Sequence, residues 1–134
     1  MSIGILLVTH PGIGDTLLEN ASKLLGNCPL RIRSLGIPLE SDREQLMRDA
    51  LEAARALDDG SGILILTDAF GATPSNIACE LTREMQANVV SGLNLPMLIR
   101  VFNYSNDDLA ALTRKAEEGG MRGIQVSTVP GEKA

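Results

Sequence analysis

The sequence is poor in aromatic side chains: its 134 residues include no tryptophan, one tyrosine and two phenylalanines. The core must therefore be built from aliphatic side chains. The sequence also lacks any apolar run close to the roughly 18 residues that a membrane-spanning helix needs. No basic region precedes the short apolar stretch at the N-terminus, as a secretory signal would require. We therefore expect a globular cytoplasmic protein.

Positive charge and cysteine are scarce as well. The chain has 12 Lys and Arg against 17 Asp and Glu, a formal net charge of -5, and no local cluster of basic residues. Because nucleic-acid-binding domains present a basic surface, this composition excludes DNA and RNA as partners. The two cysteines, Cys28 and Cys79, lie far apart without a CxxC motif or a nearby histidine, so a metal or redox site has no support. We interpret both as buried small apolar residues.

The length suits one domain, which we expect to span residues 1–134. The continuous apolar runs at residues 3–8 and 63–66 are typical of strands covered on both faces, as in a parallel sheet. Residues 30–35 and 124–129 alternate between apolar and polar, as expected of edge strands, and residues 88–93 predict a shorter strand.

Helices are predicted between these strands from apolar residues at helical spacing and from capping residues. The expected starts are Asp15, a capping box at Ser41–Glu44, Thr73 as a cap with Pro74 at the first position, residue 96, and residues 106–108. We expect the first helix to stop at Gly26 and the last at Gly119–Gly120. The alternation predicts a three-layer α/β/α sandwich on a mostly parallel sheet, with an edge C-terminal strand.

Three loops of this fold carry polar side chains to one edge of the sheet. Ligands of open α/β sheets bind beyond the carboxyl ends of the strands. The first strand leads to His10, the only histidine; the third leads to Asp68 and a glycine-containing helix start; the fourth leads to Asn94. We expect these side chains to converge on one site.

The residue types at this edge suit histidine chemistry. A neutral imidazole is a nucleophile near neutral pH, and a carboxylate bonded to one ring nitrogen leaves the other nitrogen with its lone pair exposed. Asp68 is placed to do this for His10. If the electrophile is a phosphoryl group, the helix start at Thr73 offers backbone N–H groups, a hydroxyl and a helix dipole, and Gly71 and Ala72 allow a close backbone approach. The pattern predicts a phosphohistidine site.

Each of these residues also has a structural interpretation, and two other templates are open to a direct check. A histidine at a strand end can serve as a hydrogen-bonding residue of the fold, and an aspartate can form a turn. The segment from Gly12 to Leu17 begins like a dinucleotide fingerprint but has leucine where the third glycine belongs, which argues against dinucleotide binding. A phosphate-accepting receiver domain needs an acidic pair after its first strand, where this chain has Thr9 and His10.

From its first strand to its last, the chain resembles the enzyme IIA component of the mannose (mannose-fructose-sorbose) family of the phosphoenolpyruvate-dependent sugar phosphotransferase system. The resemblance rests on three motifs in order: the apolar strand that ends in Thr9-His10, the sequence DAFGATPSN at residues 68–76, and GLNLPML at residues 92–98. The family usually has a glycine where this chain has Ala72, so the backbone at this residue must avoid left-handed conformations.

The resemblance implies a site and a set of partners. His10 would receive a phosphoryl group from the histidine-phosphocarrier protein, Asp68 would orient and polarise the imidazole, and Thr73 with the amides around Gly71 and Ala72 would hold the phosphate. Asn94 would border the site. No metal or organic cofactor is expected.

The resemblance also implies how such a chain works with others. Members are typically homodimers in which the final strand pairs with the sheet of the other subunit. The phosphate would pass to a IIB component in sugar uptake, peripheral to a membrane complex at most. Two alternatives stay open: a regulatory protein whose His10 phosphorylation controls a partner without sugar transport, and a small-ligand-binding domain with a structural His10.

Overall fold

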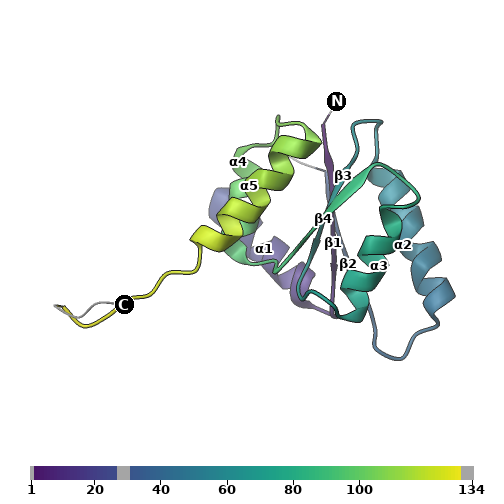
Figure 1. Cartoon of the computed structure of the whole chain (residues 1–134), viewed down its shortest axis with the longest axis horizontal. Helices are drawn as coiled ribbons and strands as arrows, with labels where there is room; N and C mark the ends of the chain where they lie inside the picture. Colours follow the sequence, from purple (N-terminus) through teal and green to yellow (C-terminus); the bar gives the residue numbers. More distant parts are fainter. Residues whose placement is uncertain (1, 27–30, 131–134) are drawn as a thin grey trace.

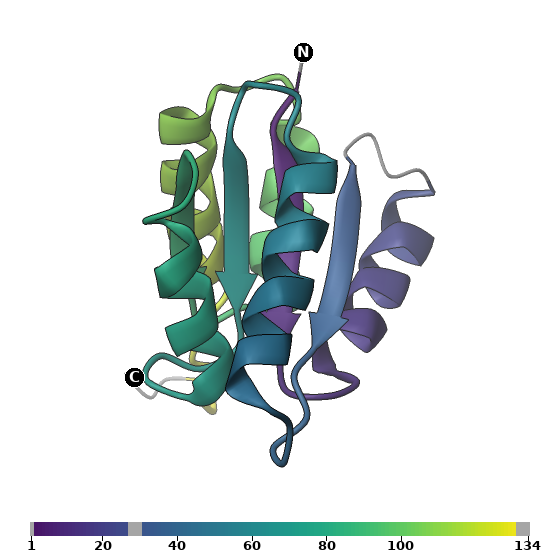
Figure 2. The ribbon, with the colours of Figure 1, turned by 90° about the vertical axis from the view of Figure 1, so that its right-hand side faces the viewer.

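A computed structural model describes residues 2–26 and 31–130 of the chain. Its centre is a four-stranded sheet in the order β2-β1-β3-β4, with all neighbouring strands parallel. The strands are β1 (Gly4–Thr9), β2 (Ile32–Gly36), β3 (Ile63–Thr67) and β4 (Ala87–Ser91). Because the strands are parallel, their carboxyl ends meet at one edge of the sheet, toward which the arrowheads in Figure 2 point.

Helices cover both faces of this sheet. Figure 1 shows α1, α4 and α5 on one side and α2 and α3 on the other. The helices are α1 (Ile13–Leu25), α2 (Arg43–Leu57), α3 (Thr73–Leu81), α4 (Leu95–Asn103) and α5 (Leu109–Arg122). The predicted three-layer α/β/α sandwich is confirmed. None of the helices in the described part of the chain has the length and apolarity needed to span a bilayer.

Two aliphatic cores lie on the two faces of the sheet. Successive residues of a strand point to opposite faces, so Ile5 and Leu7 of β1 pack under α1, α4 and α5, while Leu6 and Val8 pack under α2 and α3. Every residue of the central strands β1 and β3 is buried, which accounts for their continuous apolar sequence. The edge strand β2 is only partly buried, as predicted for an edge strand.

Helix α1 begins earlier than predicted. Its N-cap is Gly12, with φ of 83°, so Asp15 lies inside the first turn and does not cap the helix. The hydroxyl of Thr9 instead accepts a hydrogen bond from the backbone N–H of Gly14. A side chain from the end of β1 thus performs the capping role, which no local pattern around residue 15 could indicate.

Two further caps are shifted by one residue. The N-cap of α2 is Asp42, whose carboxylate accepts from the N–H of Glu44, and Ser41 lies outside the helix. The N-cap of α3 is Ala72, without a side-chain cap bond, and Thr73 is the first helical residue. At α2 the adjacent polar residues Ser41 and Asp42 both offer a cap, whereas at α3 the chain enters the helix one residue before the predicted cap, Thr73.

The glycine pair in α5 does not end the helix, contrary to the prediction, because α5 continues to Arg122. A Cβ atom at Gly119 would lie 2.5 Å from the Cβ of Arg100, and one at Gly120 would lie 2.8 Å from the Cε of Met97. Both contacts are with α4. These glycines therefore allow α4 and α5 to pack closely. From the sequence alone, a glycine pair with this role cannot be distinguished from a pair that ends a helix.

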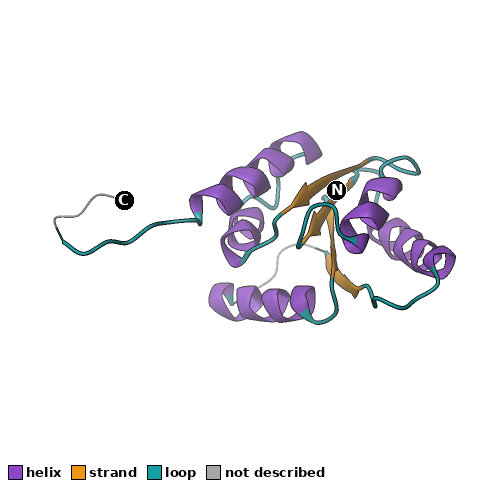
Figure 3. Ribbon diagram, turned by 60° about the horizontal axis from the view of Figure 1, so that its bottom comes forward, coloured by secondary structure: helices purple, strands orange, loops and turns teal. Residues whose placement is uncertain are grey.

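The predicted C-terminal edge strand is absent from the described sheet. Residues 124–130 form an exposed, irregular segment that leaves the body of the molecule after α5 (Figures 1 and 3). A strand needs a hydrogen-bonded neighbour, and no described strand pairs with this segment. Its apolar residues Ile124, Val126 and Val129 are all exposed.

The interpretation of the cysteines is wrong for Cys79, and Cys28 lies outside the described residues. Cys79 is exposed on α3 with a free thiol. The core-facing positions of this helix are taken by Ile77, Ala78 and Leu81, so the helical period turns residue 79 toward solvent.

Candidate functional site

His10 is the first residue after β1, between the loops that follow β2 and β3. Two hydrogen bonds fix its backbone. The carbonyl oxygen of His10 accepts one from the Thr9 hydroxyl at 2.7 Å and one from the N–H of Ile13 at 3.3 Å. The same Thr9 oxygen accepts from the N–H of Gly14 at 3.0 Å. The imidazole stays 32% exposed. The loop therefore fixes the backbone of His10 while leaving its ring accessible.

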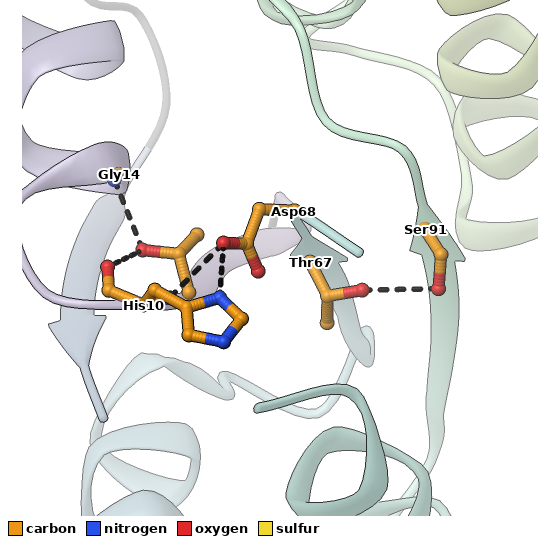
Figure 4. A network of polar contacts seen from close by, with 6 residues as sticks. His10, Gly14, Thr67, Asp68 and Ser91 are labelled. Carbon is orange, nitrogen blue, oxygen red and sulfur yellow. Dashed lines mark hydrogen bonds and ion pairs between the residues drawn. The ribbon is translucent and has the colours of Figure 1, made fainter. Parts of the chain in front are cut away.

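Asp68 is the first residue after β3, and one of its oxygens binds His10 twice (Figure 4). Asp68 Oδ2 lies 2.7 Å from His10 Nδ1 and accepts from the backbone N–H of His10 at 3.1 Å. An acceptor this close to Nδ1 favours the tautomer with the proton on Nδ1. In that tautomer Nε2 carries the lone pair, and no described residue forms a hydrogen bond with it.

The environment of Asp68 favours its charged form. Burial raises the pKa of this carboxyl group, but hydrogen bonds from the His10 ring and backbone N–H lower it, and the net pKa lies below the ordinary 3.8. The group is thus a carboxylate near neutral pH. Its second oxygen, Oδ1, is buried without a hydrogen-bond partner among the described residues.

Two threonines support the site, although the sequence analysis gave neither of them a role. Thr9 and Thr67 are fully buried at the ends of β1 and β3, directly before His10 and Asp68. The Thr67 hydroxyl donates to the Ser91 hydroxyl of β4 at 3.0 Å (Figure 4). A threonine that ends an otherwise apolar strand was the available signal, because a buried hydroxyl needs a hydrogen-bond partner.

The β3–α3 loop contains the predicted phosphate-binding residues. Gly71 has φ of 84°, a left-handed conformation that favours glycine. Ala72 has φ of -81° and ψ of 169°, so alanine fits there without strain. No side chain caps α3, so the N–H groups of Thr73 and Ser75 in its first turn have no hydrogen bond within the described residues; Pro74 has no N–H, and the N–H of Asn76 bonds the carbonyl of Ala72. The exposed Thr73 thus presents an N–H group and a hydroxyl at a helix start that suits an anion.

Asn94 is engaged in the fold. Its side-chain oxygen caps α4 by accepting from the N–H of Met97 at 2.9 Å, and its amide donates to the carbonyl of Gly120 at 3.2 Å. It lines a groove of about 530 Å³ beside β4, together with Phe70 and Ser91. Asn94 therefore ties α4 to α5 and borders this groove, and within the described residues it forms no hydrogen bond with His10 or Asp68.

Comparison with known proteins shows which family the chain is similar to. Residues 4–117 match the family model described as "PTS system fructose IIA component". The chain is 29% identical over its full length to the PTS system mannose-specific EIIAB component of Escherichia coli K12, and it spans only 42% of that protein. Over 77% of its length it is 31% identical to the PTS system sorbose-specific EIIA component of Lacticaseibacillus casei, covering 74% of that relative.

Solved structures share the fold. The mannose/sorbose specific IIA subunit of the phosphotransferase system from Enterococcus faecalis superposes with a TM-score of 0.85 at 20% identity, over 99% of this chain and 100% of that one. The EIIA component from Streptococcus agalactiae gives a TM-score of 0.79 at 27% identity, over 92% of this chain and 96% of that one.

Proposed function

Because the chain belongs to the family of PTS system fructose IIA components, we propose that it is a cytoplasmic phosphoryl carrier of the phosphoenolpyruvate-dependent sugar phosphotransferase system. In this proposal residues 1–134 act as one IIA domain. His10 accepts a phosphoryl group from the histidine-phosphocarrier protein and passes it to a IIB partner in sugar uptake. The observation that carries the proposal is the 2.7 Å contact between His10 Nδ1 and Asp68 Oδ2, which leaves Nε2 free.

The transfer uses the lone pair of Nε2. This nitrogen attacks the phosphorus of the donor phosphohistidine, a new Nε2–P bond forms, and the donor N–P bond breaks, with its electron pair returning to the donor imidazole. The proton stays on Nδ1, and the ring of His10 gains positive charge. The Asp68 carboxylate stabilises that charge. Attack by the IIB nucleophile reverses these changes.

The β3–α3 loop supplies the phosphate contacts in this proposal. Phosphoryl oxygens need hydrogen-bond donors, and the uncapped first turn of α3 offers backbone N–H groups at the positive end of its dipole. Thr73 adds a hydroxyl, and Gly71 and Ala72 present the backbone without bulky side chains. Asn94 borders the site by holding the start of α4.

Labelling with radioactive phosphate tests the proposal. The chain is mixed with labelled phosphoenolpyruvate, enzyme I and the histidine-phosphocarrier protein, and we expect an acid-labile, base-stable phosphoprotein. His10 is the only histidine, so His10→Ala must remove this label completely. Label that persists in His10→Ala contradicts the site assignment. Nitrogen and phosphorus NMR of the labelled parent should locate the phosphorus on Nε2.

The recipient is tested by a chase. Adding a IIB protein to the purified phosphoprotein should remove the label from His10 within seconds to minutes and transfer it to the IIB protein. A label that stays on His10 in the presence of IIB proteins, yet changes the binding of another partner, would favour a regulatory role over transport.

We also propose that the chain is a homodimer in which the C-terminal segment of one subunit pairs with the sheet of the other. The support is an exposed apolar segment at residues 124–129 on one side and, on the other, strand β4 at the edge of the sheet with a groove beside it. Val126→Asp places a charge in this segment. Sedimentation equilibrium should give a dimer for the parent and a monomer for Val126→Asp; a parent that is monomeric at high concentration contradicts this assembly.

A further inference from the structure

The loop that carries Asp68 and the proposed phosphate contacts is weakly held. Phe70 is 86% exposed, and beyond its chain neighbours no atom lies within 4 Å of a Cβ added at Gly71. The hydrogen bond from the N–H of Ala72 to the carbonyl of Ala69 is long, at 3.4 Å. Few contacts therefore keep this loop in one conformation, although the donors that meet a phosphoryl oxygen must be placed accurately.

The same loop forms part of the wall of the groove beside β4. Phe70 lines this groove together with Ser91 at the end of β4 and Ile124 just after α5. The Ser91 hydroxyl accepts a hydrogen bond from Thr67, the residue before Asp68 (Figure 4). An occupant of the groove would thus contact the loop at Phe70 and also contact Ser91, which is bonded to the end of β3.

A second copy of the chain carries a segment that fits this groove. Residues 124–130 carry no charge and expose Ile124, Val126 and Val129, and the groove is mainly apolar, with one arginine and one glutamate in its lining. In its own chain the segment points away from the body (Figure 1). Strand β4 is at the sheet edge, and none of the described strands pairs with its outer side, so its backbone can accept an added strand. Each copy has both segment and groove, so a symmetric exchange covers both.

We propose that the phosphoryl-transfer site is complete only in the dimer: the C-terminal segment of the partner copy fills the groove, covers the ring of Phe70 and thereby fixes the phosphate-binding loop. This inference rests on the proposed function and on the assembly proposed with it, and it makes the chemistry depend on that assembly. Covering an exposed aromatic ring stabilises the loop conformation in which the ring meets the partner. The amides around Gly71 then keep the positions that the phosphoryl oxygens need.

A small phosphoryl donor tests the chemistry without a donor protein surface. With phosphoramidate, a bond forms between Nε2 of His10 and phosphorus, the P–N bond of the donor breaks, and its electron pair leaves on ammonia. The parent, at concentrations at which sedimentation equilibrium gives a dimer, should react about tenfold or more faster per subunit than monomeric Val126→Asp. On dilution of the parent, the rate per subunit should fall as the dimer dissociates.

Mixing two variants tests whether the segment acts from the other copy. Val126→Asp keeps His10 but has a damaged segment, whereas His10→Ala cannot be labelled but has an intact segment. An excess of His10→Ala should therefore raise the labelling rate of Val126→Asp toward that of the parent. The matched control is the double variant with His10→Ala and Val126→Asp together, which lacks an intact segment and should leave the rate unchanged.

A matched pair of groove variants tests the role of Phe70. Phe70→Ala removes the ring that joins the groove to the loop, whereas Met121→Ala shortens a side chain of α5 that lines the same groove and is 68% exposed. Both variants change exposed side chains, so the fold should stay intact while the dimer weakens. At concentrations that restore the dimer, Met121→Ala should reach the parent rate with phosphoramidate, and Phe70→Ala should stay about tenfold or more slower. Amide hydrogen exchange at residues 70–73 should be slower in the dimeric parent than in Val126→Asp.

The outcomes distinguish this inference from the two proposals on which it rests. A parent that neither phosphoramidate nor the phosphocarrier protein phosphorylates contradicts the proposed function. A parent that is phosphorylated but always monomeric overturns the assembly and this inference together. Monomeric Val126→Asp that reacts as fast as the dimeric parent overturns this inference alone, and so does the absence of rescue by His10→Ala. Equal rates for dimeric Phe70→Ala and dimeric Met121→Ala also overturn it, because the loop would then not depend on the covered ring.

Discussion

The loops that follow β1 and β3 meet at the same site but are held in different ways. In the β1–α1 loop, the Thr9 hydroxyl bonds both the carbonyl of His10 and the N–H of Gly14, so the strand end and the helix start are joined. In the β3–α3 loop, Phe70 is exposed, Gly71 has a positive φ, and α3 starts without a side-chain cap.

This difference separates two requirements of phosphoryl transfer. The nucleophile must keep one orientation, since a small displacement of a reacting group is costly in rate. The groups that hold the phosphoryl oxygens must be unoccupied when the phosphoryl group arrives, so their donors cannot be satisfied within the protein. In the proposed function, the first loop would meet the first requirement and the second loop would meet the second. Variants in the two loops should therefore fail in different ways.

The largest effect is expected at the contact between the loops. Asp68→Asn keeps an oxygen that can accept from Nδ1 but removes the charge that stabilises the phosphorylated ring, so the phosphorylation rate should fall about 100-fold. Rapid-quench labelling with the phosphocarrier protein measures this rate. An unchanged rate in Asp68→Asn would contradict an orienting and polarising role for the carboxylate.

The next effect concerns the support of the first loop. Thr9→Val keeps the shape but leaves the N–H of Gly14 without its acceptor, so the free energy of unfolding should fall by about 1–3 kcal/mol. Thr9→Ser restores the hydroxyl and should recover most of the lost stability and of the transfer rate. Urea unfolding and the labelling assay measure the two quantities. Equal behaviour of the valine and serine variants would show that the hydroxyl has no role.

A pair of glycines compares the packing at the start of α1, just after the first loop, with that of the second loop. Gly14→Ala would put a Cβ 2.5 Å from the Ser34 hydroxyl oxygen and 3.3 Å from the Cβ of Leu7, so it should destabilise by about 1–3 kcal/mol. At Gly71 no atom lies within 4 Å of an added Cβ, and only the positive φ opposes alanine, at a cost of about 1 kcal/mol. Thermal or urea unfolding of both variants tests this order. A larger loss for Gly71→Ala would mean that the positive φ of Gly71 costs more than the close contacts at Gly14, contrary to this prediction.

The smallest effect is a pH dependence. The pKa of Asp68 is lower in the folded chain than its ordinary 3.8, so its contribution to stability is present above 3.8 and is lost as the pH falls through the lowered value. The difference in unfolding free energy between the parent and Asp68→Asn should therefore decrease on acidification. Asp59, whose pKa is lowered to about 2, is present in both proteins and cancels. A difference that stays constant would exclude a lowered pKa at Asp68.

The sequence was informative wherever a local pattern reflects burial. Continuous apolar runs predicted the central strands and the alternating residues 30–35 predicted an edge strand, because burial on one or both faces acts on each residue separately. The same reasoning placed His10 and Asp68 at strand ends, where the structure brings them together. Their exact roles stay predictions until the labelling experiments are done.

Local patterns misled wherever a distant neighbour decides the outcome. Gly119 and Gly120 predicted a helix stop, yet the contact with α4 keeps them helical. Asp15 predicted a cap, yet Thr9 performs that role from the preceding strand. The alternation at residues 124–129 predicted a strand, but a strand also needs a neighbouring strand, and none of the described strands pairs with this segment.

The sequence by itself determined the order of the central strands and the helices, because this order follows from apolar periodicity. It also determined that the only histidine lies at the carboxyl end of a buried strand, because this position follows from the direction of the chain. Only the tertiary structure decided which nitrogen of His10 is free. Residues 10 and 68 are 58 positions apart, and only the pairing of β1 with β3 brings one oxygen of Asp68 within reach of both the ring and the backbone of His10. A hydrogen bond depends on such distances to within tenths of an ångström, and residue patterns carry no information at that scale.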